Sequence, residues 1–137
     1  MSAKVFLDTN ILVYAAIRDT HQLAKHERAL AIIRREAFCS SAQVLQEFYV
    51  TMSRKIAQPL TPLQALAWIE QLTAFPCLAI DHYLVRSAIE ISERYRLAYW
   101  DAAIIAAAEA LSCEQVYSED FNHGQHYGAV QVLNPFL

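Results

Sequence analysis

Polar and apolar residues follow one another along this chain in blocks that predict short strands separated by helices. Five apolar runs have the length of a strand and end at polar or turn residues. The run at 4–7 is continuous and halts at Asp8, as expected for a strand buried on both faces. We predict strands at residues 4–7, 37–39, 77–80, 115–118 and 130–133.

Capping residues and apolar stripes with helical spacing fill the segments between these strands. Ser40, followed three residues later by Gln43, has the form of a capping box that opens a helix. Asp81 can cap another helix, and the alanine-rich stretch after Tyr99 has high helix propensity. We predict helices at residues 11–16, 21–35, from 40 to 52, from 61 onward, after 81 and at 100–111.

This alternation of strands and helices predicts an α/β fold. Strand–helix–strand units join parallel strands by right-handed crossovers, so helices cover both faces of the sheet. We expect a three-layer α/β/α sandwich with a central parallel sheet of about five strands. The 137 residues, 55% of them hydrophobic, suit a single domain over residues 1–137. Ligands of such sheets bind beyond the carboxyl ends of the strands, where the search for chemistry begins.

Charge is distributed unevenly along the chain. The formal net charge of −3 gives no general attraction to nucleic acid. All 11 Lys and Arg residues lie at or before Arg96, whereas five acidic residues and no basic one follow it. Acidic side chains without basic neighbours repel one another. The C-terminal region is therefore either a solvated surface or a cation site.

Cysteine usage and the length of the apolar runs indicate the compartment. Cys39, Cys77 and Cys113 are odd in number and form no Cys-x-x-Cys pair, so we expect buried, reduced thiols. The apolar run near the N-terminus is too short for a signal peptide, and polar or charged residues interrupt every longer one. We expect a soluble cytoplasmic protein.

Two acidic residues in the first third of the chain are candidates for chemistry. Asp8 follows the first predicted strand, which is a ligand position in an open α/β sheet, although a helix N-cap is an equally ordinary role. Glu47 lies between Val44 and Phe48 on a mostly apolar helix. A desolvated carboxylate there would be costly unless it met a cation, but a tilt of the helix would leave it solvated.

Two further acidic residues lie in the last third. Asp101 is in the first turn of the alanine-rich helix, where the helix dipole also favours a negative charge. Asp120 follows the fourth predicted strand, although Asp is common in surface turns. All four carboxylates recur at the same edge of the predicted sheet. Such a group would favour a hard divalent cation such as Mg²⁺ or Mn²⁺, which can activate water for attack on a phosphodiester.

Four segments resemble, in order and spacing, the motifs of PIN domains, and more narrowly those of VapC-type toxins from bacterial toxin–antitoxin pairs. They are VFLDTNIL at 5–12, QVLQEF at 43–48, WDAAI at 100–104 and SEDF at 118–121. The resemblance spans nearly the whole chain. It implies a parallel sheet sandwiched by helices, Mg²⁺- or Mn²⁺-dependent RNA cleavage, and inhibition by a cognate antitoxin protein.

The resemblance also implies roles for individual residues. Asp8, Glu47, Asp101 and Asp120 match the acidic catalytic and metal-binding residues, and Asn10 and Ser118 match supporting polar residues. Glu119 adjoins Asp120, so the fourth motif leaves open which of the two faces the metal. We expect a metal-activated water as the nucleophile, because no His or Lys is placed by motif to act as a base on the sugar. We also expect a homodimer and no membrane association.

A zinc site and a receiver domain fit the sequence less well than a nuclease does. His123 and His126 lack the further ligands of a zinc site and are predicted to be solvated loop residues. A phosphoacceptor receiver domain also gathers acids at a sheet edge, but Asp8 stands alone and no lysine follows Lys55. Two alternatives remain open: a PIN nuclease that works in RNA processing, and a catalytically silent interaction domain.

Overall fold

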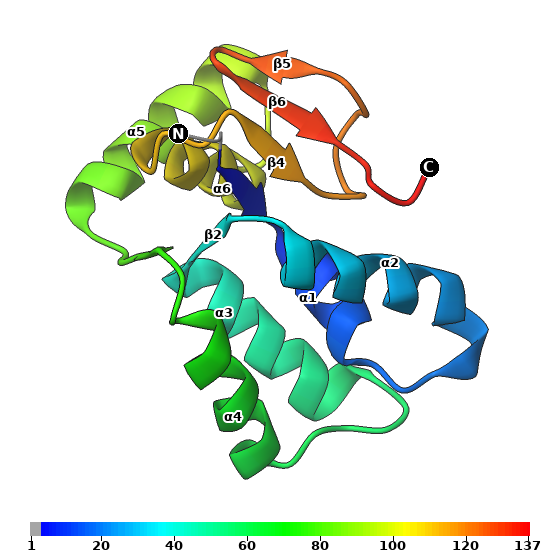
Figure 1. Cartoon of the computed structure of the whole chain (residues 1–137). Coiled ribbons are helices and arrows are strands. Elements are labelled where there is room, and N and C mark those ends of the chain that lie inside the picture. The colour runs from blue at the N-terminus through cyan, green and yellow to red at the C-terminus, as the bar shows by residue number, and fades with distance from the viewer. Residues whose placement is uncertain (1–3) are drawn as a thin grey trace.

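One sheet of six strands runs through the computed structural model, which describes residues 4–137 (Figure 1). The strand order is β3-β2-β1-β4-β6-β5, and all neighbours are parallel except β5 and β6. β1 therefore has a parallel neighbour on each side. The strands are β1 (Val5–Leu7), β2 (Phe38–Ser41), β3 (Cys77–Leu78), β4 (Gln115–Tyr117), β5 (His126–Tyr127) and β6 (Val130–Leu133).

Helices connect the parallel strands, as the alternating pattern predicts. A 3₁₀ turn, η1 (Thr20–Gln22), precedes the second helix, and a π-helical turn, η2 (Thr51–Lys55), continues the third. The α-helices are α1 (Thr9–Ala16), α2 (Leu23–Arg35), α3 (Ala42–Val50), α4 (Pro62–Leu72), α5 (His82–Tyr95) and α6 (Tyr99–Ala110).

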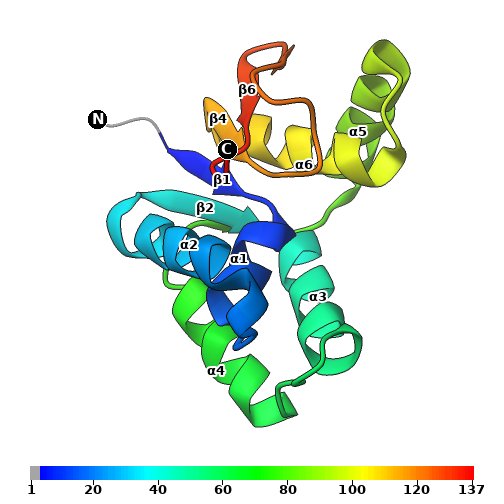
Figure 2. The ribbon, with the colours of Figure 1, turned by 90° about the vertical axis from the view of Figure 1, so that its right-hand side faces the viewer.

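The helices form a layer on each side of the sheet. The two ribbon views agree that α1 to α4 lie on one side, whereas α5 and α6 lie on the other (Figures 1 and 2). β1 is buried along its whole length because both layers cover it. This arrangement confirms the predicted three-layer α/β/α sandwich and explains why its central strand reads as a continuous apolar run.

Helix α6 owes its composition to its place between α5 and the sheet. It packs on α5 and also contacts β2, β4 and β6. Residues 102–108, all alanine or isoleucine, are buried. Small side chains on most of these positions let α5 and the strands approach α6 closely. A helix that is apolar on every side is buried, as here.

The register of the central strands brings two segments together that are more than 100 residues apart in sequence. β1 pairs with β4 so that Leu7 lies opposite Tyr117. The next residues, Asp8 and Ser118, therefore leave the sheet side by side at its carboxyl edge. β2 pairs with β1 on the other side and leads directly into α3 through Ser41. The candidate site is built at this edge.

Several predicted boundaries need correction. The sheet has six strands instead of about five, because the two-residue strand β5 pairs antiparallel with β6 and was missed. His126 lies in that strand and is exposed, whereas His123 is an exposed loop residue as predicted. The third strand stops at Leu78.

The predicted capping box of α3 is wrong by one residue. Ser40 is still part of β2, where its N–H donates to the Pro76 carbonyl (3.0 Å), and its hydroxyl has no hydrogen-bond partner. Ser41 is the N-cap instead, and its Oγ accepts from the Val44 N–H (3.3 Å). Gln43 therefore does not belong to a capping box, and its side chain makes other hydrogen bonds.

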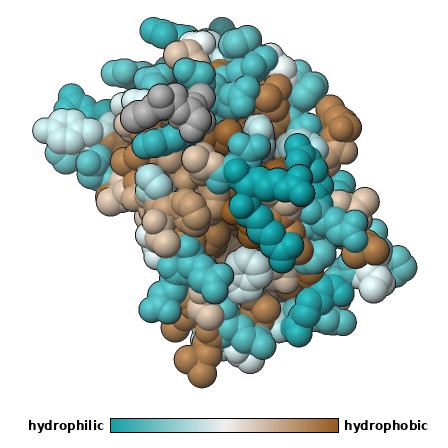
Figure 3. All heavy atoms as spheres, in the orientation of Figure 1, coloured by the Kyte–Doolittle hydropathy of each residue, from teal (hydrophilic) through white to brown (hydrophobic). Residues whose placement is uncertain are grey.

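The surface carries apolar residues as well as charge. On the face seen in Figure 3, hydrophilic residues gather over α2, and hydrophobic residues reach the surface toward α4. Leu63 and Leu66 of α4 are 80% and 58% exposed. Cys39 and Cys113 are buried free thiols, whereas Cys77 is half-buried. None of the helices within residues 4–137 combines the length and apolar character needed to span a lipid bilayer.

Candidate active site

Asp8 is the buried centre of the carboxyl edge. Its side chain is 6% exposed and sits between the end of β1 and the start of α1. Oδ1 accepts from the Thr9 N–H (2.7 Å), so Asp8 does cap α1. Oδ2 accepts from the Ser118 hydroxyl (2.7 Å). Because both oxygens are held, the orientation of this carboxylate is fixed.

A small polar network joins Asp8 to Asp120. Ser118 is fully buried, and its Oγ accepts from the Asn10 Nδ2 (3.1 Å) and from the Asp120 N–H (3.1 Å). The same Asn10 Nδ2 donates to Asp120 Oδ2 (3.1 Å). Asn10 Oδ1 accepts from the Glu119 N–H at 3.4 Å. Asn10 and Ser118 therefore hold the segment after β4 against the start of α1, which supports Asp120 in place.

Glu47 reaches the same edge from α3 and is held by Gln43. The Gln43 Nε2 donates to Glu47 Oε1 (2.9 Å) and to the Trp100 carbonyl (3.1 Å). Gln43 is buried and thus links α3 to the first turn of α6, where Asp101 lies. Glu47 itself is exposed, so the alternative of a solvated carboxylate holds for this residue.

Burial and, to a smaller extent, neighbouring charges shift the pKa values of two of the acids. Burial raises the pKa of Asp8 to about 6, hydrogen bonds from Ser118 and Thr9 oppose this rise, and the charges of Asp120 and Glu47 add to it. The pKa of Asp101 is raised by partial burial and by the charge of Asp120. Asp120 therefore couples electrostatically to both Asp8 and Asp101.

Glu119 points to a different set of partners. Its carboxylate accepts from the Lys25 ammonium (2.9 Å) and from the Tyr14 hydroxyl (2.6 Å). Lys25 also lies over the rings of Tyr14 and Phe136, at 4.9 and 5.6 Å from their centroids. The C-terminal acidic region is thus not wholly unpaired, because α2 supplies a cation to Glu119. Asp120, not Glu119, is turned toward Asn10 and the other acids.

The edge is hollowed, and its donor atoms are oxygens. A cavity of about 310 Å³ is lined by α1, α3, η2 and the segment after β4, with Asn10, Glu47 and Asp120 in its wall. No group of three or more His, Cys, Asp or Glu side chains within residues 4–137 is arranged to hold a metal ion. Mg²⁺ keeps several waters and takes one or two carboxylates directly. The donor set therefore fits a hydrated Mg²⁺ or Mn²⁺ better than a fully protein-bound ion such as zinc.

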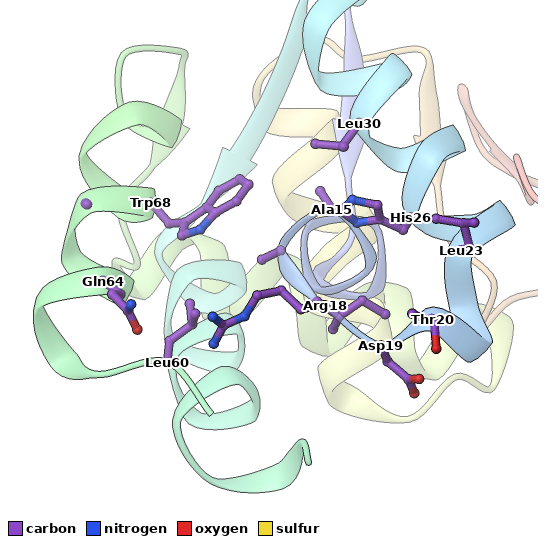
Figure 4. Close-up of a pocket in the computed structure, with 13 residues that line it drawn as sticks. Ala15, Arg18, Asp19, Thr20, Leu23, His26, Leu30, Leu60, Gln64 and Trp68 are labelled. Atoms are coloured by element: carbon purple, nitrogen blue, oxygen red, sulfur yellow. The ribbon is translucent and has the colours of Figure 1, made fainter. Parts of the chain in front are cut away.

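A second hollow, of about 620 Å³, lies between α1, α2 and the start of α4 (Figure 4). Leu23, Leu30, Leu60 and Trp68 contribute to its mostly apolar lining. Asp19 is the only carboxylate among the residues that line it. We call this hollow the apolar groove; none of the four candidate acids lines it.

Two contributors to the edge were not found from sequence. Gln43 was assigned to a cap, although its spacing of four residues from Glu47 on a helix is a signal that the two side chains meet. Lys25 is 94 residues from Glu119, and no local pattern links them.

The family model of the PIN domain matches residues 5–128. The chain belongs to the PIN domain family. This match covers every strand except β6 and includes all four candidate acids. No curated protein matches the chain.

Solved structures share the fold of this PIN domain at low sequence identity. VapC20 of Mycobacterium tuberculosis, titled a sarcin-ricin loop cleaving toxin, is 19% identical over 86% of this chain and 91% of its own, with a TM-score of 0.67. A chain of a Klebsiella pneumoniae toxin–antitoxin complex is 17% identical over 96% and 97%, with a TM-score of 0.69. A chain of Rickettsia felis VapBC2, bound to promoter DNA, is 16% identical over 94% and 96%, with a TM-score of 0.62.

Proposed function

We propose that this PIN domain is a cytoplasmic, metal-dependent endoribonuclease that acts as the toxin of a toxin–antitoxin pair. One observation carries the proposal. Buried Asp8 shares the carboxyl edge of the sheet with Asp120, to which Ser118 and Asn10 link it, and with Glu47. Burial, and to a smaller extent the charges of Asp120 and Glu47, raises the pKa of Asp8, and Lys25 of α2 is paired with Glu119. The resemblance of motifs and fold to VapC toxins supports the choice of RNA and of an antitoxin partner.

Asp8, Glu47, Asp101 and Asp120 would hold the cation in this mechanism. A bound Mg²⁺ or Mn²⁺ supplies charge stabilisation at the phosphodiester oxygens and lowers the pKa of water. The chain's own part is to position donors. Ser118 and the Thr9 N–H fix Asp8, Asn10 orients Asp120, and Gln43 orients Glu47.

The products follow from the absence of a sugar-activating base. Among residues 4–137, no His or Lys lines the acidic cavity. Attack by water leaves a 5′-phosphate and a 3′-hydroxyl. The test is cleavage of a defined RNA by purified protein in Mg²⁺, in Mn²⁺ and in excess EDTA, with the ends mapped. Full activity in EDTA, or 2′,3′-cyclic phosphate ends, would contradict the mechanism.

An antitoxin protein is the proposed partner. The apolar groove offers a seat for apolar side chains, and the acidic edge attracts a basic one. Expression of the chain alone is expected to arrest growth, and Asp8→Asn to relieve the arrest at equal soluble yield. Glu119→Gln is the matched control and is expected to stay toxic. Normal growth with soluble, RNA-cleaving wild-type protein would favour a role in RNA processing instead.

We also propose a homodimer. Large apolar side chains are exposed on α4 and α5, among them Leu63 (80%), Tyr83 (67%) and Ile89 (51%). Large apolar side chains exposed on a helix are available for protein contacts. Light scattering coupled to gel filtration measures the mass directly, and a monomer at micromolar concentration would contradict this assignment.

A further inference from the structure

We propose that a groove beside the acidic cavity, with Arg18 and Lys55 on its walls, holds the RNA strand next to the phosphodiester that is cut. The inference rests on the proposed nuclease activity and adds to it a path for the substrate. It assigns phosphate contacts to two residues outside the four acidic motifs.

The groove runs between the end of α1 with η1 and the segment that follows η2. It encloses about 620 Å³, and its polar lining includes Arg18, His21, Lys55 and Gln58. We call it the basic groove.

The basic groove and the acidic cavity adjoin one another. Val13 and Tyr14 line both hollows, so the two share one wall of α1. Lys55 also lines a smaller hollow together with Glu47 and Thr51, which in turn border the acidic cavity. A strand whose phosphate lies at the acids therefore has the basic groove directly beside it.

The charges of the basic groove are available to a ligand. Arg18 and Lys55 are both exposed, and the ion pair of Lys25 with Glu119 is the only one within residues 4–137. Asp19 is the only acid of the groove, and its Oδ1 already accepts from the His21 N–H (2.9 Å). Two free cations thus lie beside the cavity of a protein whose formal net charge is −3.

The two cations can offset the repulsion between the acidic site and RNA. Repulsion between the acids and an RNA phosphate weakens approach, and neighbouring Arg or Lys contacts offset that repulsion. Lys25 lies over the Tyr14 ring, and the Phe136 ring packs edge-on against it with the ring centroids 5.1 Å apart. Tyr14 is therefore not free to stack on a base. Recognition in the groove is therefore of the backbone, and binding is expected to depend little on sequence.

Arg18 marks the border of the basic groove. Figure 4 shows its side chain reaching toward Leu60 of the apolar groove, and Arg18 lines both the apolar groove and the basic groove. The apolar groove, with Trp68 and Leu30, offers few phosphate contacts. Lys55 and Gln58 line the basic groove but not the apolar groove, whereas Leu30 and Trp68 line the apolar groove but not the basic groove. This difference favours a nucleic-acid strand in the first and a protein segment in the second.

The test separates RNA binding from cleavage. Arg18→Gln and Lys55→Gln are compared with Arg35→Gln and Arg86→Gln, which remove exposed arginines from α2 and α5. Binding of a fluorescein-labelled, mixed-sequence single-stranded RNA of about 12 nucleotides is followed by anisotropy in EDTA over a salt series. Cleavage of the same RNA is measured in Mg²⁺.

Each groove substitution is expected to weaken binding about fivefold at 0.1 M salt and to lower the slope of log K against log salt by about 0.7. In cleavage, KM should rise by a similar factor with kcat nearly unchanged. Both control variants should match wild type, as should the melting temperatures of all four.

The possible outcomes distinguish failure of the groove proposal from failure of the proposed nuclease activity. Groove variants that behave like the controls, while wild type binds and cleaves, would overturn the groove and leave the nuclease standing. Wild type that neither binds nor cleaves would overturn both. Groove variants that keep RNA affinity but lose binding to the co-expressed antitoxin would show a peptide site and overturn the RNA assignment.

Discussion

The burial of Asp8 makes the stability of the metal-free protein fall as pH rises toward neutrality. The pKa of Asp8 is raised from 3.8 to about 6 in the folded chain, so the folded state holds its proton more tightly than the unfolded state does. Stability from this group is therefore full at low pH and is lost as pH rises through about 6.

The size of the effect follows from that difference in pKa. At about 1.4 kcal/mol per pH unit, a rise from 3.8 to about 6 costs the folded state about 3 kcal/mol once Asp8 is ionised. About 2 kcal/mol of this is lost between pH 4 and pH 7. The side chain is only 6% exposed, so solvent screens little of it.

Asp8→Asn removes the charge but disturbs one hydrogen bond. The Asn carbonyl can still accept from the Thr9 N–H and cap α1. Its amide then faces Ser118 Oγ, which already accepts from Asn10 and from the Asp120 N–H. This clash of donors costs about 1–3 kcal/mol at any pH. The variant should thus be less stable than wild type at pH 4.5 and equal or more stable at pH 7.5.

Urea denaturation in EDTA at several pH values between 4.5 and 7.5 tests whether the stability curves of wild type and Asp8→Asn cross. The exposed α5 N-cap Asp81, whose Oδ1 accepts from the Leu84 N–H (2.9 Å), provides the control Asp81→Asn. That change is expected to shift the free energy of unfolding by less than about 0.5 kcal/mol at pH 7.5, since Asn caps nearly as well as Asp. Free-energy curves for wild type and Asp8→Asn that stay parallel over the whole range would refute the reasoning.

Three further outcomes are expected. Asp120→Asn should abolish RNA cleavage, whereas Glu119→Gln, which disturbs only the contact with Lys25 and Tyr14, should keep most of it in a gel-based assay. Millimolar Mg²⁺ should raise the melting temperature of wild type but not of Asp120→Asn, because a ligand stabilises only the protein that retains its donors; equal shifts by calorimetry would argue against the site. Arg96→Gly should raise the free energy of unfolding by about 0.5–1 kcal/mol in urea, since Arg96 caps α5 at a φ of 54° that glycine adopts more easily.

Local sequence was sufficient where one interaction dominates. β1 was predicted because a strand covered on both faces must be apolar, β4 and β6 because their apolar residues have the length of a strand, and α6 because it is alanine-rich and buried. β5 was missed because two residues with one antiparallel partner carry no periodic signal. The Ser40 cap was wrong because a serine can end a strand or begin a helix, and only the pairing with Cys77 decides.

The arrangement of the acidic edge needed tertiary contacts. Motif order led us to propose four acids. Lys25 lies on α2 and reaches Glu119 only in the folded chain, so the sequence alone could not favour Asp120 over Glu119. Glu47 lies between the buried Val44 and Phe48 on α3, yet it is exposed and lines the acidic cavity. Trp100 shows the same limit, because its 67% exposure cannot be read from its place on a mostly apolar helix.

Keeping one acid buried among partly exposed ones has a physical consequence for control of the enzyme. At neutral pH the ionised Asp8 carries its cost of about 3 kcal/mol until a positive charge arrives, so a divalent cation and a basic side chain of an antitoxin both gain from the same unrelieved charge. On the proposed function, the two ligands must compete, since each satisfies the carboxylates that the other needs. Inhibition would then weaken as Mg²⁺ or Mn²⁺ rises, and the acids that make the site costly to fold would also make it easy to block.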